Sequence, residues 1–319
     1  MRILFIRTDR IGDFLLNLPA IHALKETYPD SKISVLIHPE VQELVNNHPD
    51  IDEFISFTSW KNLFFALLKK KYDMAIISNP HKYFHLLTFL ARIPQRIGYR
   101  RKWGFLLTHS IEDKKAQSLK HEVEYNLDLV SQAKAHTSSP TYHIPLSQEE
   151  ETTTVLWLQK QGLDLKKPII VINPYTTASF KQWPPHHFIE LIKKFSPLPV
   201  QLVLIGGNKE SFLIKQEILP HLKDQPIFDF SGLLSLKQLA VLLKKATLLI
   251  SNDSGPIHIA AAFNTKTLVL FGNKNTGSNP KRWGPWKSPE AIILQALAIQ
   301  NIKVKDVWTQ IQKQFQSSF

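Results

Sequence analysis

Apolar runs of strand length alternate with helical patterns along the first half of the chain. The predicted strands cover 2–8, 32–37, 53–57 and 74–78, and the predicted helices cover 20–28, 41–46 and 63–69. The run Ile3-Leu4-Phe5-Ile6 is apolar without alternation, as is typical of strands that are buried on both faces. This rhythm predicts a parallel sheet with helices on both sides, a Rossmann-like domain.

The same rhythm restarts in the second half. Strands are predicted at 168–173, 200–206, 248–251 and 267–271, and helices at 185–195, 236–244 and 256–263. Between the halves, residues 133–151 (AKAHTSSPTYHIPLSQEEE) are rich in Ser, Thr and Pro, which suits an interdomain linker. We predict an α/β protein with Rossmann-like domains at 1–148 and 149–300, whose parallel sheets face a central cleft. A last helical pattern at 304–315, within the C-terminal segment 301–319, could pack back on the first domain.

Length and composition agree with two folded domains. A chain of 319 residues exceeds what one core usually fills, and 43% hydrophobic with 21% charged residues is typical of globular proteins. Nothing approaches about 18 consecutive apolar residues, and the start MRILFIRTDR leads directly into a strand, so we expect a cytoplasmic protein. The absence of cysteine excludes disulfides, thiolate metal sites and a cysteine nucleophile.

Charge adds a preference for anionic partners. The formal net charge is +12; residues 1–150 carry 19 Lys and Arg against 17 Asp and Glu, whereas residues 151–319 carry 20 against 10. Such an excess favours nucleotides, phosphorylated lipid or nucleic acid without choosing among them, and a dispersed solubilising surface fits equally well.

The first strand-to-helix junction, residues 7–13 (RTDRIGD), is the first candidate site. An acid at a helix start can simply cap the helix or lie in its first turn, where the dipole favours it, and Gly12 can simply permit a tight turn. However, the junction lies at the carboxyl end of a central strand, where open α/β sheets bind ligands. The helix dipole should keep Asp13 ionised, so that it could act as a general base; Asp9 is a weaker candidate.

A second cluster, residues 173–184 (NPYTTASFKQWP), follows a predicted strand and precedes a helix. Thr176, Thr177 and nearby amides can donate hydrogen bonds to phosphate oxygens, and Lys181 can offset the charge of a diphosphate leaving group. Hydroxyls are also common in ordinary loops, which is the alternative.

The third cluster, residues 251–258 (SNDSGPIH), is the sharpest motif. Ser254 and the amide of Gly255 at a helix start can bind phosphate, and His258 lies about one turn further on. The alternative is a capped helix with an incidental histidine.

Two weaker motifs and one basic segment complete the candidates. Glu210 follows Gly206-Gly207 and could contact a ribose or simply begin a helix. Asp50-Ile51-Asp52 matches a metal-binding Asp-x-Asp pattern, but it precedes its strand and so stands at the wrong end for a ligand site; we therefore expect no metal. The basic segment 92–103, with Arg92, Arg96, Arg100, Arg101 and Lys102, could bind lipid phosphates or remain a solvated loop.

Taken together, the segment 9–20 (DRIGDFLLNLPA), Thr176-Thr177 with 181–184 (KQWP), and 251–262 (SNDSGPIHIAAA) resemble the ADP-heptose:lipopolysaccharide heptosyltransferases. The three blocks occur in that family's order and span both predicted domains. The resemblance implies a GT-B fold and an inverting transfer of heptose from ADP-heptose to the lipopolysaccharide inner core. It also implies no metal, no cofactor beyond the ADP-sugar donor substrate, no nucleic-acid partner, and work at the cytoplasmic face of the anionic inner membrane.

The resemblance also assigns roles to residues of this chain. It makes Asp13 the base, aided by Lys181 at the leaving group. Apart from the resemblance, acceptor binding is predicted for Arg10 and Gly12 at the first junction and for Arg100 and Arg101 of the basic segment. The nucleotide-sugar contacts are Thr176, Thr177, Lys181, Glu210, Asp253, Ser254, Gly255 and His258. One departure is 272–276 (GNKNT), where the family has a Gly-Pro-Thr-like turn.

Two other functions stay open at this stage. The same fold could transfer a different nucleotide-linked sugar to another surface glycan. A non-catalytic basic protein that binds nucleic acid or anionic membrane would also suit the charge, although no nucleic-acid-binding module is recognisable.

Overall fold

The computed structural model describes residues 1–57, 59–79, 81–140, 142–272 and 278–315, with side chains described up to Lys313. The chain divides into two compact units, Met1–Pro145 and Leu146–Phe319. The division lies three residues before the predicted boundary. It falls just before Ser147, whose side chain accepts from the Glu150 amide in a capping box that begins the next helix.

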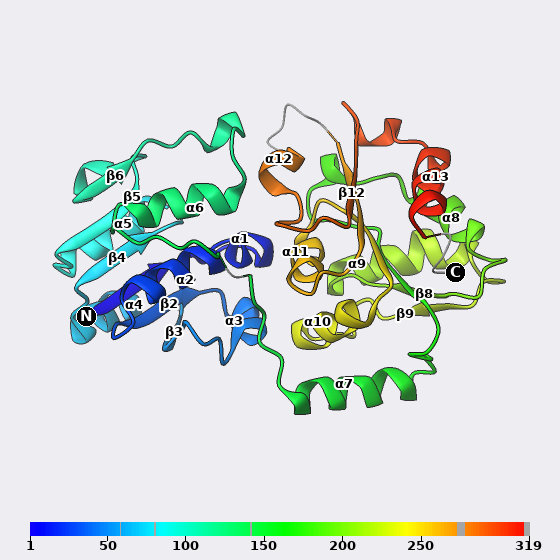
Figure 1. Cartoon of the computed structure of the whole chain (residues 1–319), viewed down its shortest axis with the longest axis horizontal. Helices are drawn as coiled ribbons and strands as arrows, with labels where there is room; N and C mark the ends of the chain where they lie inside the picture. The colour runs from blue at the N-terminus through cyan, green and yellow to red at the C-terminus, as the bar shows by residue number, and fades with distance from the viewer. Residues whose placement is uncertain (58, 80, 141, 273–277, 316–319) are drawn as a thin grey trace. The chain divides into compact units, whose positions relative to one another are not determined.

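The first unit is a doubly wound α/β domain (Figure 1). Its elements are β1 (Arg2–Ile6), α1 (Ile11–Leu15), α2 (Leu18–Thr27), β2 (Lys32–Ile37), α3 (Pro39–Val45), β3 (Glu53–Ser56), α4 (Trp60–Lys70), β4 (Met74–Ile77), α5 (Lys82–Leu90), β5 (Gln95–Tyr99), η1 (Gly104–Leu106), β6 (His109–Ile111), η2 (Lys115–Gln117) and α6 (Glu122–Ser131). The six strands are all parallel, in the order β3-β2-β1-β4-β5-β6. The order reverses between β1 and β4, which makes their carboxyl ends the expected ligand site.

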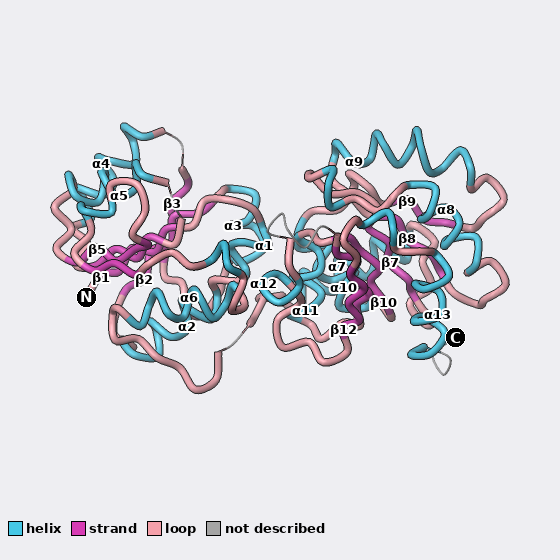
Figure 2. Tube along the Cα trace, turned by 90° about the horizontal axis from the view of Figure 1, so that it is seen from above, coloured by secondary structure: helices cyan, strands magenta, loops and turns pink. Residues whose placement is uncertain are grey.

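Helices cover both faces of this sheet, as its uniformly apolar strands require. Helix α2 packs against α6 on one face, and α4 and α5 lie on the other (Figure 2). The core beneath α4 and α5 joins strand residues such as Leu4 and Ile77 to Leu67 of α4 and Phe84 of α5.

The second unit repeats the architecture. Its elements are α7 (Gln148–Lys160), β7 (Ile169–Asn173), η3 (Ser179–Lys181), α8 (Pro185–Lys194), β8 (Gln201–Leu204), α9 (Asn208–Leu213), η4 (Ile214–Ile218), η5 (Leu219–His221), β9 (Ile227–Asp229), α10 (Leu236–Lys245), β10 (Leu248–Asn252), α11 (Gly255–Ala262), β11 (Thr267–Phe271), α12 (Pro280–Trp283), β12 (Ala291–Gln295), η6 (Ile299–Asn301) and α13 (Val304–Phe315). The parallel strand order is β12-β11-β10-β7-β8-β9, with its reversal between β7 and β10.

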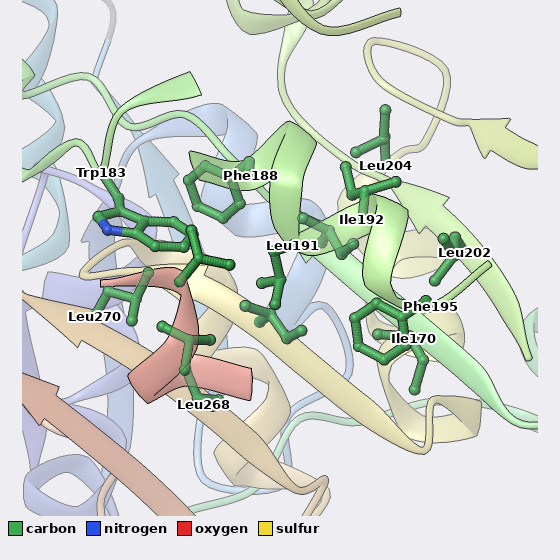
Figure 3. Close-up of a cluster of buried hydrophobic side chains, with 14 of the residues drawn as sticks. Ile170, Trp183, Phe188, Leu191, Ile192, Phe195, Leu202, Leu204, Leu268 and Leu270 are labelled. Atoms are coloured by element: carbon green, nitrogen blue, oxygen red, sulfur yellow. The ribbon is translucent and has the colours of Figure 1, made fainter. Parts of the chain in front are cut away.

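A cluster of buried apolar side chains lies between α8 and the sheet of this unit (Figure 3). Phe188 and Leu191 of α8 meet Ile170 of β7 and Leu268 of β11, and Trp183 closes one end. Each fully buried side chain of this kind contributes about 1.5–3 kcal/mol to folding.

Helix α13 belongs to this same cluster. Its residues Val307 and Ile311 are buried there, Trp308 packs edge-on against Phe195, and the helix contacts α8. The indole of Trp183 donates to the carbonyl of Ile302, just before α13. The structure therefore gives α13 a place on the second unit, where the sequence suggested a return to the first.

Candidate active site

Arg7 organises the polar cluster of the first unit at the carboxyl end of β1. Its guanidinium Nε lies 2.6 Å from Asp9 Oδ1, and its Nη2 lies 2.6 Å from Asp13 Oδ1. The side chain is buried, and its backbone amide continues the sheet by donating to the carbonyl of Leu36. The arginine thus holds both acids of the predicted junction with one rigid fork.

Asp13 does not cap α1, but it lies in the first turn of that helix, which is the other structural explanation that the sequence left open. The N-cap of α1 is Arg10, and no side chain caps this helix, since Asp13 lies within its first turn. Gly12 also lies inside α1, so its role is not the tight turn that the sequence suggested. Among the described residues, no group bonds Oδ2 of Asp13, and the side chain is 23% exposed. One carboxylate oxygen is therefore positioned by Arg7 and the other remains accessible.

Burial shifts the acidity of Asp13. Burial has the largest effect and raises the pKa of the carboxyl, whereas Arg7 lowers it and the nearby acids Asp9 and Glu122 raise it further. The net pKa of Asp13 is above its ordinary value. Arg7 opposes the effect of burial on this pKa only in part. A carboxylate with a raised pKa is the stronger base.

Behind Arg7 lies a buried polar network that the sequence did not reveal. Ser78, the first residue after β4, accepts from Arg7 Nη1 through its carbonyl at 3.1 Å and donates from its hydroxyl to Asn17 Oδ1 at 2.7 Å. Asn17 donates to the carbonyl of Asp13 at 2.7 Å. Ser78 follows β4 directly, and β4 lies beside β1. Because the carboxyl ends of neighbouring parallel strands meet at one edge of the sheet, this position was the one sequence signal that could have placed Ser78 near Arg7.

An ion pair extends this network. Lys115 Nζ lies 2.5 Å from Glu122 Oε1 and 3.1 Å from Asn126 Oδ1, and all three residues are buried. Asn126 donates to the carbonyl of Leu16, next to the Asp13 helix, at 3.0 Å. Lys115 and Glu122 are only seven residues apart, but Asn126 and Leu16 are 110 apart, so spacing along the chain could not indicate that the pair reaches the Asp13 helix.

The second unit gathers its candidates at the carboxyl ends of β7 and β10. Lys181 Nζ, in η3 after β7, lies 2.6 Å from Asp253 Oδ2, which follows β10. Ser278 donates to the same Asp253 oxygen at 2.8 Å. Three segments far apart in sequence thus meet at the strand-order reversal of this sheet.

Ser254 is the N-cap residue of α11, but its hydroxyl bonds other groups instead of the amides of the helix. Its hydroxyl accepts from Asn173 Nδ2 at 2.8 Å and donates to the carbonyl of Asn252 at 3.2 Å, and the helix has no side-chain cap. The alternative of an Asp-Ser-Gly cap therefore holds for the backbone, whereas the Ser254 hydroxyl makes no capping hydrogen bond. Gly255 is the first helical residue, so its amide is among those at the helix start that no intrahelical acceptor satisfies.

Asn252 fixes the neighbouring loop. Its Oδ1 accepts from the amide of Trp183 at 3.0 Å, and its Nδ2 donates to the carbonyl of Pro174 at 2.8 Å. The loop between these anchors carries Thr176 and Thr177, whose side chains form no hydrogen bond within the described residues and are at least partly exposed. Their hydroxyls are available to a ligand.

The remaining predicted residues take varied places. Glu210 lies in the first turn of α9, and a Cβ on Gly207 would come within 2.8 Å of its carboxylate, so glycine leaves that carboxylate room. His258 is only 4% exposed within α11, which makes it part of the wall behind the site. Arg10 and Arg100 are exposed, and Arg101 pairs with Asp113. The departure at 272–276 lies outside the described residues except for Gly272.

Asp50 and Asp52 have structural partners. Asp50 lies 3.0 Å from His22, and Asp52 accepts from the amide of Ile33 and pairs with Lys25. Both precede β3 and so lie at the amino ends of the parallel strands, whereas Asp13 lies at their carboxyl ends. In the described ranges no three His, Asp or Glu side chains come together as a group that could hold a metal.

Comparison with known proteins places this geometry in a family. The profile of glycosyltransferase family 9 (heptosyltransferase) matches residues 60–310. The chain is 28% identical over 302 residues to lipopolysaccharide heptosyltransferase 2 of Salmonella typhimurium, an alignment covering 88% of this chain and 85% of that protein. It is also 27% identical over 303 residues to lipopolysaccharide heptosyltransferase 2 of Escherichia coli, over 88% and 85% of the two chains.

Solved structures share the fold. The structure of Escherichia coli ADP-heptose lipopolysaccharide heptosyltransferase II superposes with a TM-score of 0.85 at 24% identity, covering 100% of this chain and 99% of that one. The predicted fold class, two Rossmann-like domains of the GT-B type, is confirmed. Since the family profile spans most of both units, the chain belongs to glycosyltransferase family 9 and is a glycosyltransferase of the heptosyltransferase kind.

Proposed function

We propose that this enzyme transfers heptose from ADP-heptose to an acceptor in the lipopolysaccharide core by a single inverting displacement. The related solved enzyme is described as an ADP-heptose lipopolysaccharide heptosyltransferase, and the curated relatives are lipopolysaccharide heptosyltransferases. The first unit would bind the acceptor and the second the nucleotide sugar.

The observation that carries this proposal is the arrangement of Asp13. Its Oδ1 is held by Arg7 while its Oδ2 is left without a partner in the described structure. In the proposed step, Oδ2 takes the proton of the acceptor hydroxyl as that oxygen forms a bond to the anomeric carbon of heptose. The bond from the anomeric carbon to the diphosphate oxygen breaks, and ADP leaves with the electron pair.

The second unit supplies the groups for the leaving ADP. Lys181 and the amide of Gly255 would donate to the diphosphate, with Thr176 and Thr177 providing further hydroxyls. The contact between Lys181 and Asp253 holds the ammonium at the loop before the donor binds. Because Lys181 and the start of α11 can offset the developing charge, we propose that transfer proceeds without a metal or cofactor.

The test is an Asp13→Asn enzyme assayed with ADP-heptose and purified core acceptor. Asparagine keeps the shape and loses the base, so turnover should fall about 10²-fold or more while ADP affinity stays within twofold of wild type. Asp30→Asn, an exposed acid of the same unit, serves as the control and should retain full turnover. Near-normal turnover by the Asp13 variant would show that another group is the base.

The identity of the donor needs a separate measurement. Calorimetric titration with ADP-, UDP- and GDP-linked sugars should show binding of the ADP-heptose alone at micromolar concentrations. Binding of a UDP- or GDP-sugar without detectable ADP-heptose affinity would keep the transferase and replace the sugar, which is the second candidate left open by the sequence.

A lipopolysaccharide acceptor implies work at the cytoplasmic face of the inner membrane. No helix in the part of the chain that the structure describes is both long and apolar enough to cross a bilayer. We therefore propose peripheral association with the anionic membrane surface.

A further inference from the structure

One layer of the first unit exposes large apolar side chains. They come from α4, α5 and η1, and they are Phe65, Leu68, Tyr83, Phe89, Leu90 and Phe105. Phe65 is 58% exposed and Phe105 82% exposed. The inner sides of α4 and α5 already fill the core with other residues, including Leu67 and Phe84. The two helices are thus apolar on their outer side as well, which packing within the fold does not require.

Ring contacts join the three elements into one surface, here called the aromatic face. The ring of Trp60, the first residue of α4, lies 5.3 Å from that of Tyr83 on α5. The ring of Tyr83 lies 5.9 Å from that of Trp103, which precedes η1. Both helices lie on the same side of the sheet (Figure 2), so their outer residues share one side of the unit.

Cations stand at both ends of the aromatic face. Because α4 and α5 each return between parallel strands, they run in the same direction, and Lys61 and Lys82 lie together at their beginnings. Lys69, Lys71 and Arg92 lie at or just beyond their ends. Across the described ranges, none of these five side chains has an acidic partner, and all but the partly buried Lys82 are exposed. They are available to anions in solution.

The charge of the first unit is strongly polarised along the sequence. Residues 54–111, which include α4, α5 and η1, contain ten Lys and Arg and a single acid, Asp73. The other residues of 1–145 contain nine Lys and Arg against fourteen Asp and Glu. The positive segment is therefore the one that carries the exposed aromatic residues.

We propose that the aromatic face docks on the surface of an anionic phospholipid bilayer. Aromatic rings favour the boundary between headgroups and acyl chains, and flanking Lys and Arg reach the phosphates. Apolar side chains in the centre with unpaired cations at both ends match that layered surface, whereas the phosphate backbone of a nucleic-acid duplex would leave Phe65, Phe89 and Phe105 without apolar partners. The inference rests on the proposed function only in the expectation that the acceptor is attached to a membrane.

The experiment is flotation of the full chain with vesicles of phosphatidylcholine alone or with about 30% phosphatidylglycerol. The wild type should float with the anionic vesicles and weakly or not at all with the neutral ones. Phe65→Ser with Phe105→Ser should reduce partitioning at least tenfold. Lys61→Gln with Lys69→Gln should reduce it about 25-fold, since each cation near such a surface contributes roughly fivefold, and 0.5 M salt should reproduce much of that loss.

A matched control and a second assay separate the outcomes. Leu156→Ser with Lys160→Gln removes an exposed apolar residue and an exposed cation from α7 of the other unit and should leave flotation unchanged. All variants should transfer sugar to a soluble, delipidated core acceptor at the wild-type rate. Transfer lost from the wild type with flotation intact would reject the proposed function and keep the docking face.

Two results would overturn the docking proposal. One is a wild type that does not float with anionic vesicles. The other is flotation that is equal for the wild type and the Phe65/Phe105 variant. If light scattering shows a wild-type dimer that the Phe65/Phe105 variant loses, and vesicles do not bind, the aromatic face is instead a contact between copies of the chain.

Discussion

The contact between Arg7 and Asp13 makes a quantitative prediction about pH. In the proposed reaction Asp13 acts as the unprotonated base, so kcat/KM falls as pH drops through its pKa. Burial raises this pKa and Arg7 opposes the rise from 2.6 Å away. An opposite charge at such range typically lowers a carboxyl pKa by about 1–3 units, equivalent to about 1.4–4 kcal/mol. Removing Arg7 should therefore move the acid limb of the profile upward by that amount.

The assay compares pH profiles of kcat/KM between pH 5 and 9 for two substitutions. Arg7→Met removes the charge, and the apparent pKa on the acid side of its kcat/KM profile should rise by about 1–3 units. Arg7→Lys keeps the charge but loses the fork that also holds Asp9, so its limb should move by less than about one unit, with part of the rate lost to poorer positioning. The lysine variant also tests whether any loss in the methionine variant reflects folding.

A charge removed elsewhere in the same unit provides the control. Lys25→Met breaks a contact with Asp52, at the amino ends of the strands. The acid side of its pH profile should coincide with that of the wild type. If the Arg7→Met limb also coincides with that of the wild type, Arg7 does not govern the base. If the Arg7→Met limb moves downward, the sign of the argument is wrong.

Three further predictions concern other charged groups. Lys181→Met should weaken ADP binding about 10–100-fold by calorimetry, because one charge-assisted contact is lost. Lys194→Met, on α8, is the control and should bind ADP normally. Unchanged ADP affinity of the Lys181 variant would show that Lys181 is not part of the donor site. Lys115→Met removes the ion pair with the buried Glu122 and should lower the free energy of urea unfolding by about 3–5 kcal/mol. Lys120→Met, in an exposed pair, should lower it by less than about 1 kcal/mol. Similar small losses for both variants would argue against a structural role of Lys115. Burial is the largest effect lowering the pKa of His48, to about 4, and its Nδ1 accepts from the amide of Asp50. The folded state therefore resists protonation of His48. The contribution of this residue to the free energy of unfolding is complete above about pH 6.5 and should fall by about 3 kcal/mol toward pH 4. In urea titrations, His48→Asn should make the free energy of unfolding less dependent on pH, and an unchanged pH dependence would contradict the assignment.

Local patterns predicted several elements closely and missed others of similar length, among them α5, β5, α6, α7 and β12. The strands at Lys32–Ile37 and Thr267–Phe271 and the helix at Val304–Phe315 agree with the structure at both ends. The edge strands β6 and β9, of three residues each, were not predicted, because so short a run has no distinct period and its pairing with a neighbour decides it. The place of α13 on α8 was likewise undecided, since an amphipathic helix shows that it needs a partner and not which one.

The sequence by itself determined the two-unit α/β architecture and the positions of Asp13, Lys181 and Ser254 at strand ends, because strand order and chain direction place such residues at one edge of a sheet. The tertiary structure decided their partners. Arg7 meets Asp13 across six positions of the β1–α1 junction, but Ser78 and Asn126 reach that site from distant segments, and Asp253 reaches Lys181 across 72 positions. The same dependence on packing sets the acidity of Asp13, since burial and a neighbouring guanidinium act through space. A base can be located from its place on a strand, but what tunes it is known only once the chain has folded.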